Sequence, residues 1–277
     1  MGYSWADVPN SVRSTGTVIS RPAAARPTHE TGVEGLGTPR TRLRIVLLQV
    51  REDRIPLRQE QGCFIERCRV ARDQINFFNV VDDPVIRWSD VENAHAVIVG
   101  GAGAYSVTED HTFTPALTDV VLELIDRDRP VFGSCWGHQF LAAVTGGSVI
   151  EDADRSEIGS IPIELTVAGR ADPIFEGFPK RFYVQLGHKD RVAELGPGWV
   201  DLAVSDLCPN QAIRLAGKPV YGTQFHSEMN EDRLRERLEV YVDSYVPDRE
   251  AFLDIIRRLR PSIEADGIMR RFLELYA

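Results

Sequence analysis

The chain has 277 residues, 43% of them hydrophobic, which is enough to bury the core of one large α/β domain. Its formal net charge of −9 argues against nucleic acid or an anionic membrane as a main partner. The four cysteines lack the spacing of a disulfide framework, and no apolar run approaches the length of a membrane span, so we expect a cytoplasmic protein.

Residues 1–41 are rich in Ser, Thr, Pro, Gly, Ala and Arg and contain few large apolar side chains. This composition predicts a flexible N-terminal tail. Gly2 suggests an N-myristoylation site, but Ala6 stands where Ser or Thr is required. Scattered arginines suggest a transit peptide, but acidic residues in the same segment argue against it.

After the tail, apolar runs alternate with segments of helical spacing. Residues 43–50 and 94–99 are nearly continuous apolar runs, as expected of buried parallel strands, and another such run begins at Val131. Segments at about 59–74 and 117–125 have the periodicity of helices. This alternation predicts an α/β fold with a doubly wound, mostly parallel (flavodoxin-like) sheet, whose ligands bind beyond the carboxyl ends of the strands.

Between residues 148 and 224 the pattern changes. Short β-prone runs at 161–167 and 181–186 are separated by Gly, Pro and Asp turns. We expect this region to form a small antiparallel sheet and to return the chain to the strand ends of the first half.

Residues 230–277 show three stretches of helical apolar spacing, and Asn230 with the acidic residues after it is a suitable helix start. The apolar positions of the first stretch are Leu234, Leu238, Tyr241, Val242 and Tyr245. We therefore expect one domain at 42–229 and a helical extension at 230–277 that packs on it. An alternative is that these helices form or obstruct a docking face for a partner.

The most informative motif places Cys135 between two glycines, Gly133 and Gly137, directly after an apolar strand and before an apolar helix. A nucleophile on such a strand–turn–helix is held in a strained conformation, and the helix N-terminus favours the reactive thiolate. The alternative is that Cys135 is a buried thiol of the core, as most free cysteines are.

A second motif, His226-x-Glu228, follows a β-prone run. Residues two apart at a strand end point to the same side, so Glu228 can orient an imidazole that His226 presents to a sulfur atom. A lone histidine in a strand is more often structural. A cysteine turn followed later by His-x-Glu nevertheless fits a catalytic triad in residue type and in order.

Metal binding has little support in the sequence. Cys63 and Cys68 lie in an expected helix and lack a second pair of ligands that would complete a zinc site. We therefore expect no metal and no other cofactor.

The chain resembles the class I (triad) glutamine amidotransferases, especially the glutaminase domain of GMP synthetase and its free-standing relatives. The resemblance covers about residues 42 to 229, and four segments carry it in the family's order. They are the Gly-Gly loop at 97–107, the cysteine turn at 133–139, the segment 184–192 and the segment 207–212. The resemblance implies that Cys135 is the nucleophile, that His226 is the general base and then acid, and that Glu228 orients it.

The resemblance also implies the groups that surround the nucleophile. The backbone N–H groups of Gly101 and Trp136 would form the oxyanion hole. Glycine suits this position because a main-chain donor must closely approach the developing charge with no Cβ in the way. Gln139 and the backbone around Gly187 and His188 would hold the amino-acid end of glutamine.

The sequence departs from the family's pattern at two positions. Ser227 replaces the usual Pro between the catalytic His and Glu, and Ala102 replaces the Pro that commonly follows the Gly-Gly pair. Both departures affect loop rigidity and leave the triad spacing intact. The chain also shows no ATP-pyrophosphatase or other synthetase region that would consume ammonia.

Three functions remain open from the sequence. The first is a glutaminase that cleaves the γ-amide of glutamine and feeds ammonia to a separate synthetase chain. The second is a stand-alone hydrolase or peptidase that acts on γ-glutamyl peptides or amides through the same thioester. The third, a binding protein without activity, is disfavoured by the intact triad. Ammonia release from glutamine, compared with amine release from γ-glutamyl peptides, separates the first two.

Overall fold

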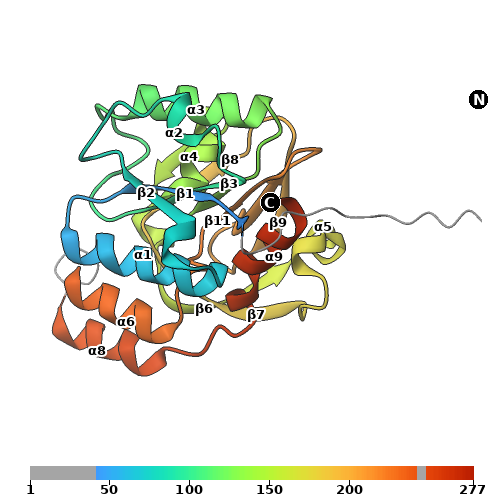
Figure 1. Ribbon diagram of the computed structural model, residues 1–277. Helices are drawn as coiled ribbons and strands as arrows, with labels where there is room; N and C mark the ends of the chain where they lie inside the picture. Colours follow the sequence, from blue (N-terminus) through green and yellow to red (C-terminus); the bar gives the residue numbers. More distant parts are fainter. Residues whose placement is uncertain (1–41, 242–247) are drawn as a thin grey trace, which may run out of the picture. The chain divides into compact units, whose positions relative to one another are not determined.

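The computed structural model describes residues 42–241 and 248–277 (Figure 1). These residues belong to one compact unit, Gly37–Ala277. The N-terminal tail expected at 1–41 lies outside the described residues, as do Val242 and Tyr245.

A nine-stranded sheet forms the centre of the described chain. In sheet order its strands are β2 (Ile75–Asn79), β1 (Ile45–Val50), β3 (Ala96–Ala102), β4 (Val131–Ser134), β11 (Val220–Thr223), β10 (Ala212–Leu215), β9 (Trp199–Val204), β6 (Glu157–Leu165) and β7 (Arg181–His188). Every neighbouring pair from β2 to β11 is parallel, and every pair from β11 to β7 is antiparallel. The expected doubly wound α/β sheet is thus confirmed, with an antiparallel half.

The antiparallel strands expected between residues 148 and 224 are present, and they are divided between two sheets. The runs expected at 161–167 and 181–186 are strands β6 and β7, and they extend the main sheet instead of forming a separate one. The small antiparallel sheet is formed by β5 (Ser148–Glu151) and β8 (Asp190–Glu194). The sheet that a strand joins cannot be read from local spacing, because strands of either sheet have the same two-residue alternation.

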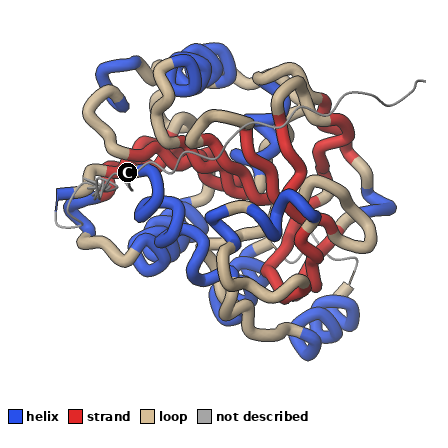
Figure 2. The backbone as a smooth tube through the Cα atoms, turned by 90° about the vertical axis from the view of Figure 1, so that its right-hand side faces the viewer, coloured by secondary structure: helices blue, strands red, loops and turns tan. Residues whose placement is uncertain are grey.

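Helices cover both faces of the main sheet (Figures 1 and 2). The described helices of four or more residues are α1 (Arg54–Cys68), α2 (Trp88–Val91), α3 (Thr114–Asp126), α4 (Trp136–Val144), α5 (Val167–Ala171), α6 (Glu231–Val240), α8 (Arg249–Arg258) and α9 (Ile268–Tyr276). Alternate residues of β1 enter two different cores: Ile45 and Leu47 pack with α1 and α9, while Val46 and Leu48 pack with α3 and α4. This alternation follows from the two-residue period of a strand that is buried on both sides.

The first helix begins earlier and ends earlier than the expected 59–74. Pro56 is tolerated near its start because the first N–H groups of a helix have no acceptor within the helix. The helix stops at Cys68 because Arg69 takes a left-handed conformation, with φ of 53°, and its N–H caps backbone carbonyls of the last turn.

The C-terminal helices pack against elements of the same unit. The side chain of Asn230 accepts a hydrogen bond from the N–H of Arg233 at 3.0 Å, so α6 begins where the sequence indicated. Helix α6 contacts α1, α8 contacts β6, and α9 contacts α1. No helix in the described part of the chain is long and apolar enough to cross a membrane.

Candidate active site

Cys135 occupies a strained turn between β4 and α4. Its φ of 51° and ψ of −102° are unfavourable for a residue with a Cβ, and such strain is concentrated at functional sites. Its N–H donates to the carbonyl of Thr223 at 2.8 Å, which fixes the turn to β11. A Cβ on Gly133 would lie 2.6 Å from the backbone carbon of Gly137, and one on Gly137 would clash with the carbonyl of Val99. Both glycines are therefore required for the helix to approach the sheet.

Three side chains form a buried chain of contacts next to this turn. His226 Nδ1 lies 2.7 Å from Glu228 Oε1, and Ser134 Oγ donates to Glu228 Oε2 at 2.8 Å. Thr223 pairs with Ser134 in the parallel β11–β4 register, which brings the end of β11 beside the turn at Cys135. His226 and Glu228 lie in a turn after β11, so their contact does not arise from the strand alternation expected from the sequence. The residues that were expected to form a triad are nevertheless adjacent.

The charges of this group favour a protonated imidazole. Burial by itself lowers the pKa of His226, but the Glu228 carboxylate and the Cys135 side chain, which is within hydrogen-bonding range, raise it to about 9. Burial raises the pKa of Glu228, whereas His226 and the hydrogen bond from Ser134 lower it, and the lowering prevails. An imidazolium beside a thiol stabilises the thiolate, the nucleophilic form of cysteine.

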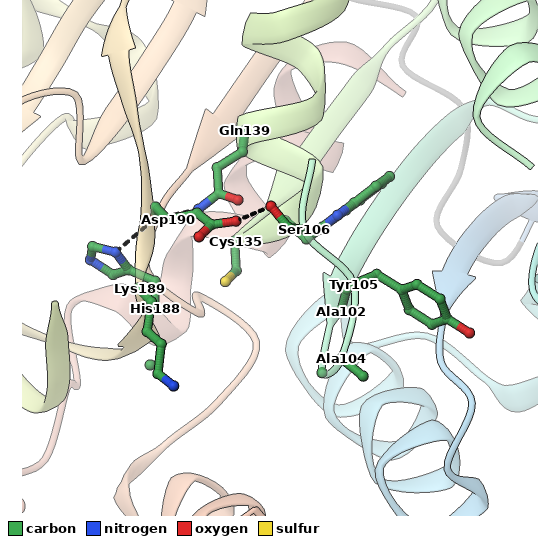
Figure 3. Close-up of a pocket in the computed structure, with 12 residues that line it drawn as sticks. Ala102, Ala104, Tyr105, Ser106, Cys135, Gln139, His188, Lys189 and Asp190 are labelled. Carbon is green, nitrogen blue, oxygen red and sulfur yellow. Dashed lines mark hydrogen bonds between the residues drawn. The ribbon is translucent and has the colours of Figure 1, made fainter. Parts of the chain in front are cut away.

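A cavity of about 160 Å³ opens onto Cys135. The loop Ala102–Ser106 lines one side and the segment Gly187–Asp190 lines the other, with Trp136 and Gln139 completing the wall. The Cys135 sulfur points into the space between these two segments (Figure 3). The cavity therefore brings Cys135, the expected nucleophile, together with the residues of α4 and of the 187–190 segment that were expected to bind the oxyanion or the substrate.

Asp190 is a polar residue of this cavity to which the sequence interpretation assigned no role, as are Lys189 and Ser106. Its Oδ2 accepts from Ser106 Oγ at 2.5 Å, which ties the two walls together (Figure 3). Its backbone carbonyl accepts from Gln139 Nε2 at 2.7 Å and lies 2.9 Å from His188 Nδ1. Asp190 stands two residues after His188, so proximity in the sequence was a usable signal. A carboxylate at this place suits the ammonium group of an amino acid.

Gly101, whose N–H was expected in the oxyanion hole, lies beside Cys135, since a Cβ on it would be 3.8 Å from the Cys135 Cβ. Its N–H donates to the buried carboxylate of Glu60 at 3.1 Å, and Gly101 is not among the described residues that line the cavity. The same carboxylate accepts from Arg51 Nη2 and Gln49 Nε2, each at 2.8 Å. A Cβ on Gly100 would lie 3.0 Å from Glu60 Oε1, so the glycine pair gives this carboxylate room.

Trp136, whose N–H was expected to contribute to the oxyanion hole, lies directly after Cys135. It is the first residue of α4 and lines the cavity beside Cys135. The first N–H groups of a helix have no acceptor within the helix, so the Trp136 N–H is available to a developing negative charge. The ring stacks on Phe140 with centroids 4.9 Å apart, which fixes the start of the helix.

One group of side chains in the described chain has the composition of a metal site. Glu157, His188 and Cys208 are buried, and their ligand atoms lie within 4.8 Å of one another. Each already has a hydrogen-bond partner: His188 Nε2 lies 3.3 Å from Glu157 Oε2, and Cys208 Sγ donates to the carbonyl of Arg155 at 3.3 Å. Burial and the neighbouring Glu157 raise the pKa of the Cys208 thiol to about 12, which disfavours the thiolate that a metal requires.

The family model for glutamine amidotransferase class-I matches residues 64–238, which is more than half of the chain. The chain belongs to the class I glutamine amidotransferases. Its resemblance to this family, inferred from four motifs, is thereby confirmed.

Sequence relatives of this amidotransferase include GMP synthases. It is 38% identical over 110 residues to one subunit of the glutamine-hydrolyzing GMP synthase of Pyrococcus abyssi, covering 39% of this chain and 56% of the relative. It is 34% identical over 146 residues to the glutamine-hydrolyzing GMP synthase of Thermosipho africanus, covering 53% of this chain and 26% of the relative. The matches thus span about half of the first relative and about a quarter of the second.

Solved structures share the fold of this amidotransferase. A glutamine amidotransferase from Thermotoga maritima superposes with a TM-score of 0.65 at 21% identity, covering 84% of this chain and 97% of that one. A glutamine amido transferase from Methylobacillus flagellatus gives a TM-score of 0.66 at 20% identity, with coverage of 84% and 95%. At these identities the likeness establishes the fold.

Proposed function

We propose that this amidotransferase hydrolyses the γ-amide of glutamine through Cys135, His226 and Glu228, and releases ammonia and glutamate. The observation that carries the proposal is the buried contact chain from Ser134 through Glu228 to His226, which ends beside the strained Cys135. The resemblance to relatives that carry "glutamine-hydrolyzing" in their names supports glutamine as the substrate.

The proposed reaction has two steps at Cys135. The thiolate attacks the γ-carbonyl carbon, and the C–N bond breaks as His226 gives its proton to the departing nitrogen. Ammonia leaves, and a γ-glutamyl thioester remains. The neutral His226 then takes a proton from water, whose oxygen attacks the thioester carbonyl. The C–S bond breaks, which releases glutamate and restores the thiolate and imidazolium.

The cavity supplies groups for both ends of glutamine. The Trp136 N–H would receive the negative charge of the tetrahedral intermediate, and loss of such a donor typically costs on the order of 10²–10³ in rate. For Gly101 to contribute a second donor to the oxyanion hole, its N–H must break its hydrogen bond to the Glu60 carboxylate. Asp190 would bind the α-ammonium group of glutamine. Gln139 and His188 would position Asp190 through their contacts with its backbone carbonyl, and Gly187 lies in the same segment.

We also propose that the ammonia is used by a separate synthetase chain. Several relatives are named as one subunit of GMP synthase, and the matched region spans about half of each. Co-purification and measurement of ammonia transfer to an acceptor test this part of the proposal.

The test of the function is the rate at which the purified protein forms glutamate from glutamine, compared with its rate on γ-glutamyl peptides. We expect glutamine to be the better substrate and Cys135→Ser to abolish turnover without loss of folding. Fast cleavage of γ-glutamyl peptides with inert glutamine would contradict the proposal. Labelling by a glutamine-analogue electrophile at another cysteine would contradict the site.

A further inference from the structure

A second, smaller cavity lies on the His226 side of the site. It has a volume of about 20 Å³ and is lined by His226, by Leu234, Arg237 and Leu238 of α6, and by Tyr241 just after that helix. We call it the His226 chamber. It shares two lining residues, Ala102 and Gly187, with the larger cavity that contains Cys135. The two cavities are therefore neighbours across the catalytic pair.

The chemistry of the proposed reaction assigns the departing amine to this side. The nitrogen that leaves must come within hydrogen-bond reach of His226, because His226 protonates it. The water that later attacks the thioester must approach the same imidazole. The amino-acid end of the substrate would then face the other way, toward Asp190 and Gln139, which line the larger cavity.

The size of the chamber limits what can leave. A cavity of about 10–15 Å³ is enough for one water molecule. The chamber, at about 20 Å³, therefore holds one molecule of water or ammonia. An alkylamine or amino acid would overlap Leu234 and Leu238, which are buried in the contact between α6, α8 and α1. Those leucines are packed on their far side and cannot simply move away.

Arg237, which lines the chamber, also suits a small neutral occupant. Arg237 is 6% exposed, and its Nε donates to Gln59 Oε1 at 2.5 Å, while its Nη2 is buried without a hydrogen-bond partner among the described protein atoms. Water and ammonia can accept a hydrogen bond from a guanidinium group, whereas ammonium cannot. The wall therefore fits ammonia before it is protonated, or the water that replaces it.

Tyr241 links the chamber to the substrate loop. A Cβ on Gly103 would clash with the Tyr241 hydroxyl, so this ring lies directly against the loop that lines the larger cavity. Helix α6 and the residue after it thus form the wall on the leaving-group side.

From these observations we infer that α6, chiefly through Leu238, restricts this enzyme to primary γ-glutamyl amides by excluding N-substituted leaving groups. The inference rests on the proposed function and goes beyond it, because the triad alone does not select between glutamine and γ-glutamyl peptides.

The experiment compares three amides that yield the same product, glutamate: glutamine, γ-glutamylmethylamide and γ-glutamylethylamide. The wild-type protein should prefer glutamine, with roughly a 10- to 100-fold loss of kcat/KM for each added carbon. Leu238→Ala should raise the relative kcat/KM for the ethylamide by roughly 10-fold or more, because it enlarges the chamber. Leu238→Val, a smaller change, should act in the same direction if the alanine variant does not fold.

Leu259→Ala is the matched control. Leu259 is a buried leucine of the same apolar cluster, but it is not among the residues that line the chamber. It should lower stability and leave the ratio between the amides unchanged. Equal rates of the wild-type protein on glutamine and the ethylamide would overturn the inference. An unchanged ratio in folded Leu238 variants would also overturn it. Absence of glutamate release from all three amides would instead overturn the proposed function.

Discussion

The variant Glu228→Gln isolates the electrostatic role of the carboxylate next to His226. Glutamine has nearly the same shape and still accepts a hydrogen bond from Ser134, so the variant removes charge with little change in volume. In the native protein burial lowers the pKa of His226, while Glu228 and Cys135 raise it to about 9, against an ordinary 6.5. At about 1.4 kcal/mol for each pKa unit, the surroundings favour the imidazolium by on the order of 3 kcal/mol.

The pH dependence of kcat/KM reports this effect. The protonated imidazole is the form that pairs with the thiolate, so native activity should fall as the pH rises through about 9. In Glu228→Gln the contribution of the carboxylate is lost while burial still lowers the pKa of His226 and Cys135 still raises it, so the fall should move to lower pH. At neutral pH the rate should drop by on the order of 10²–10⁴.

Glutamate release, measured from acidic to alkaline pH, provides the assay. Ser134→Ala is the control, since it removes one hydrogen bond to Glu228 and keeps its charge. In Ser134→Ala the fall of kcat/KM at alkaline pH should stay near the pH at which it occurs in the native enzyme. If Glu228→Gln retains a fall near pH 9, the carboxylate does not set the charge of His226, and the reasoning is refuted.

Three further outcomes follow from local packing and charge. A glutamine-analogue electrophile should alkylate Cys135 and not Cys63, because burial raises the pKa of the Cys63 thiol to about 12. Peptide mapping identifies the alkylated cysteine, and a modified Cys63 would contradict this prediction. Gly137→Ala should cost roughly 1–3 kcal/mol or more in denaturant unfolding, whereas Gly62→Ala, with nothing within 4 Å of the added Cβ, should be neutral or slightly stabilising. Glu60→Gln should cost about 3–5 kcal/mol, because a buried guanidinium loses its carboxylate; a loss below about 1 kcal/mol would argue against this ion pair.

Much of the fold and the main site residues were predictable from the sequence, because their signals are local. The apolar run before Cys135 and the spaced glycines predicted a strand, a turn and a helix, and the structure contains all three. His226 and Glu228 were expected beside the cysteine from their order in the chain, and the parallel pairing of β4 and β11 brings them there. The reason given for their mutual contact was wrong, since a turn and not a strand joins them.

Features that depend on long-range packing were not predictable. The target of the Gly101 N–H is Glu60, 41 residues earlier in the chain, and a charged residue in an expected helix gives no sign that it will be buried. The His226 chamber depends on how α6 lies against the substrate loop. Neither contact leaves a periodic or spacing signal, because each joins elements whose packing is fixed only by the whole fold.

The central claim is that Cys135 forms a γ-glutamyl thioester with glutamine. The most direct measurement is mass spectrometry of the protein after acid quenching during turnover of glutamine, followed by peptide mapping. The account predicts a γ-glutamyl adduct on the peptide that contains Cys135, and its absence in Cys135→Ser. Steady glutamate formation with no adduct on that peptide, or with an adduct on another cysteine, would contradict it.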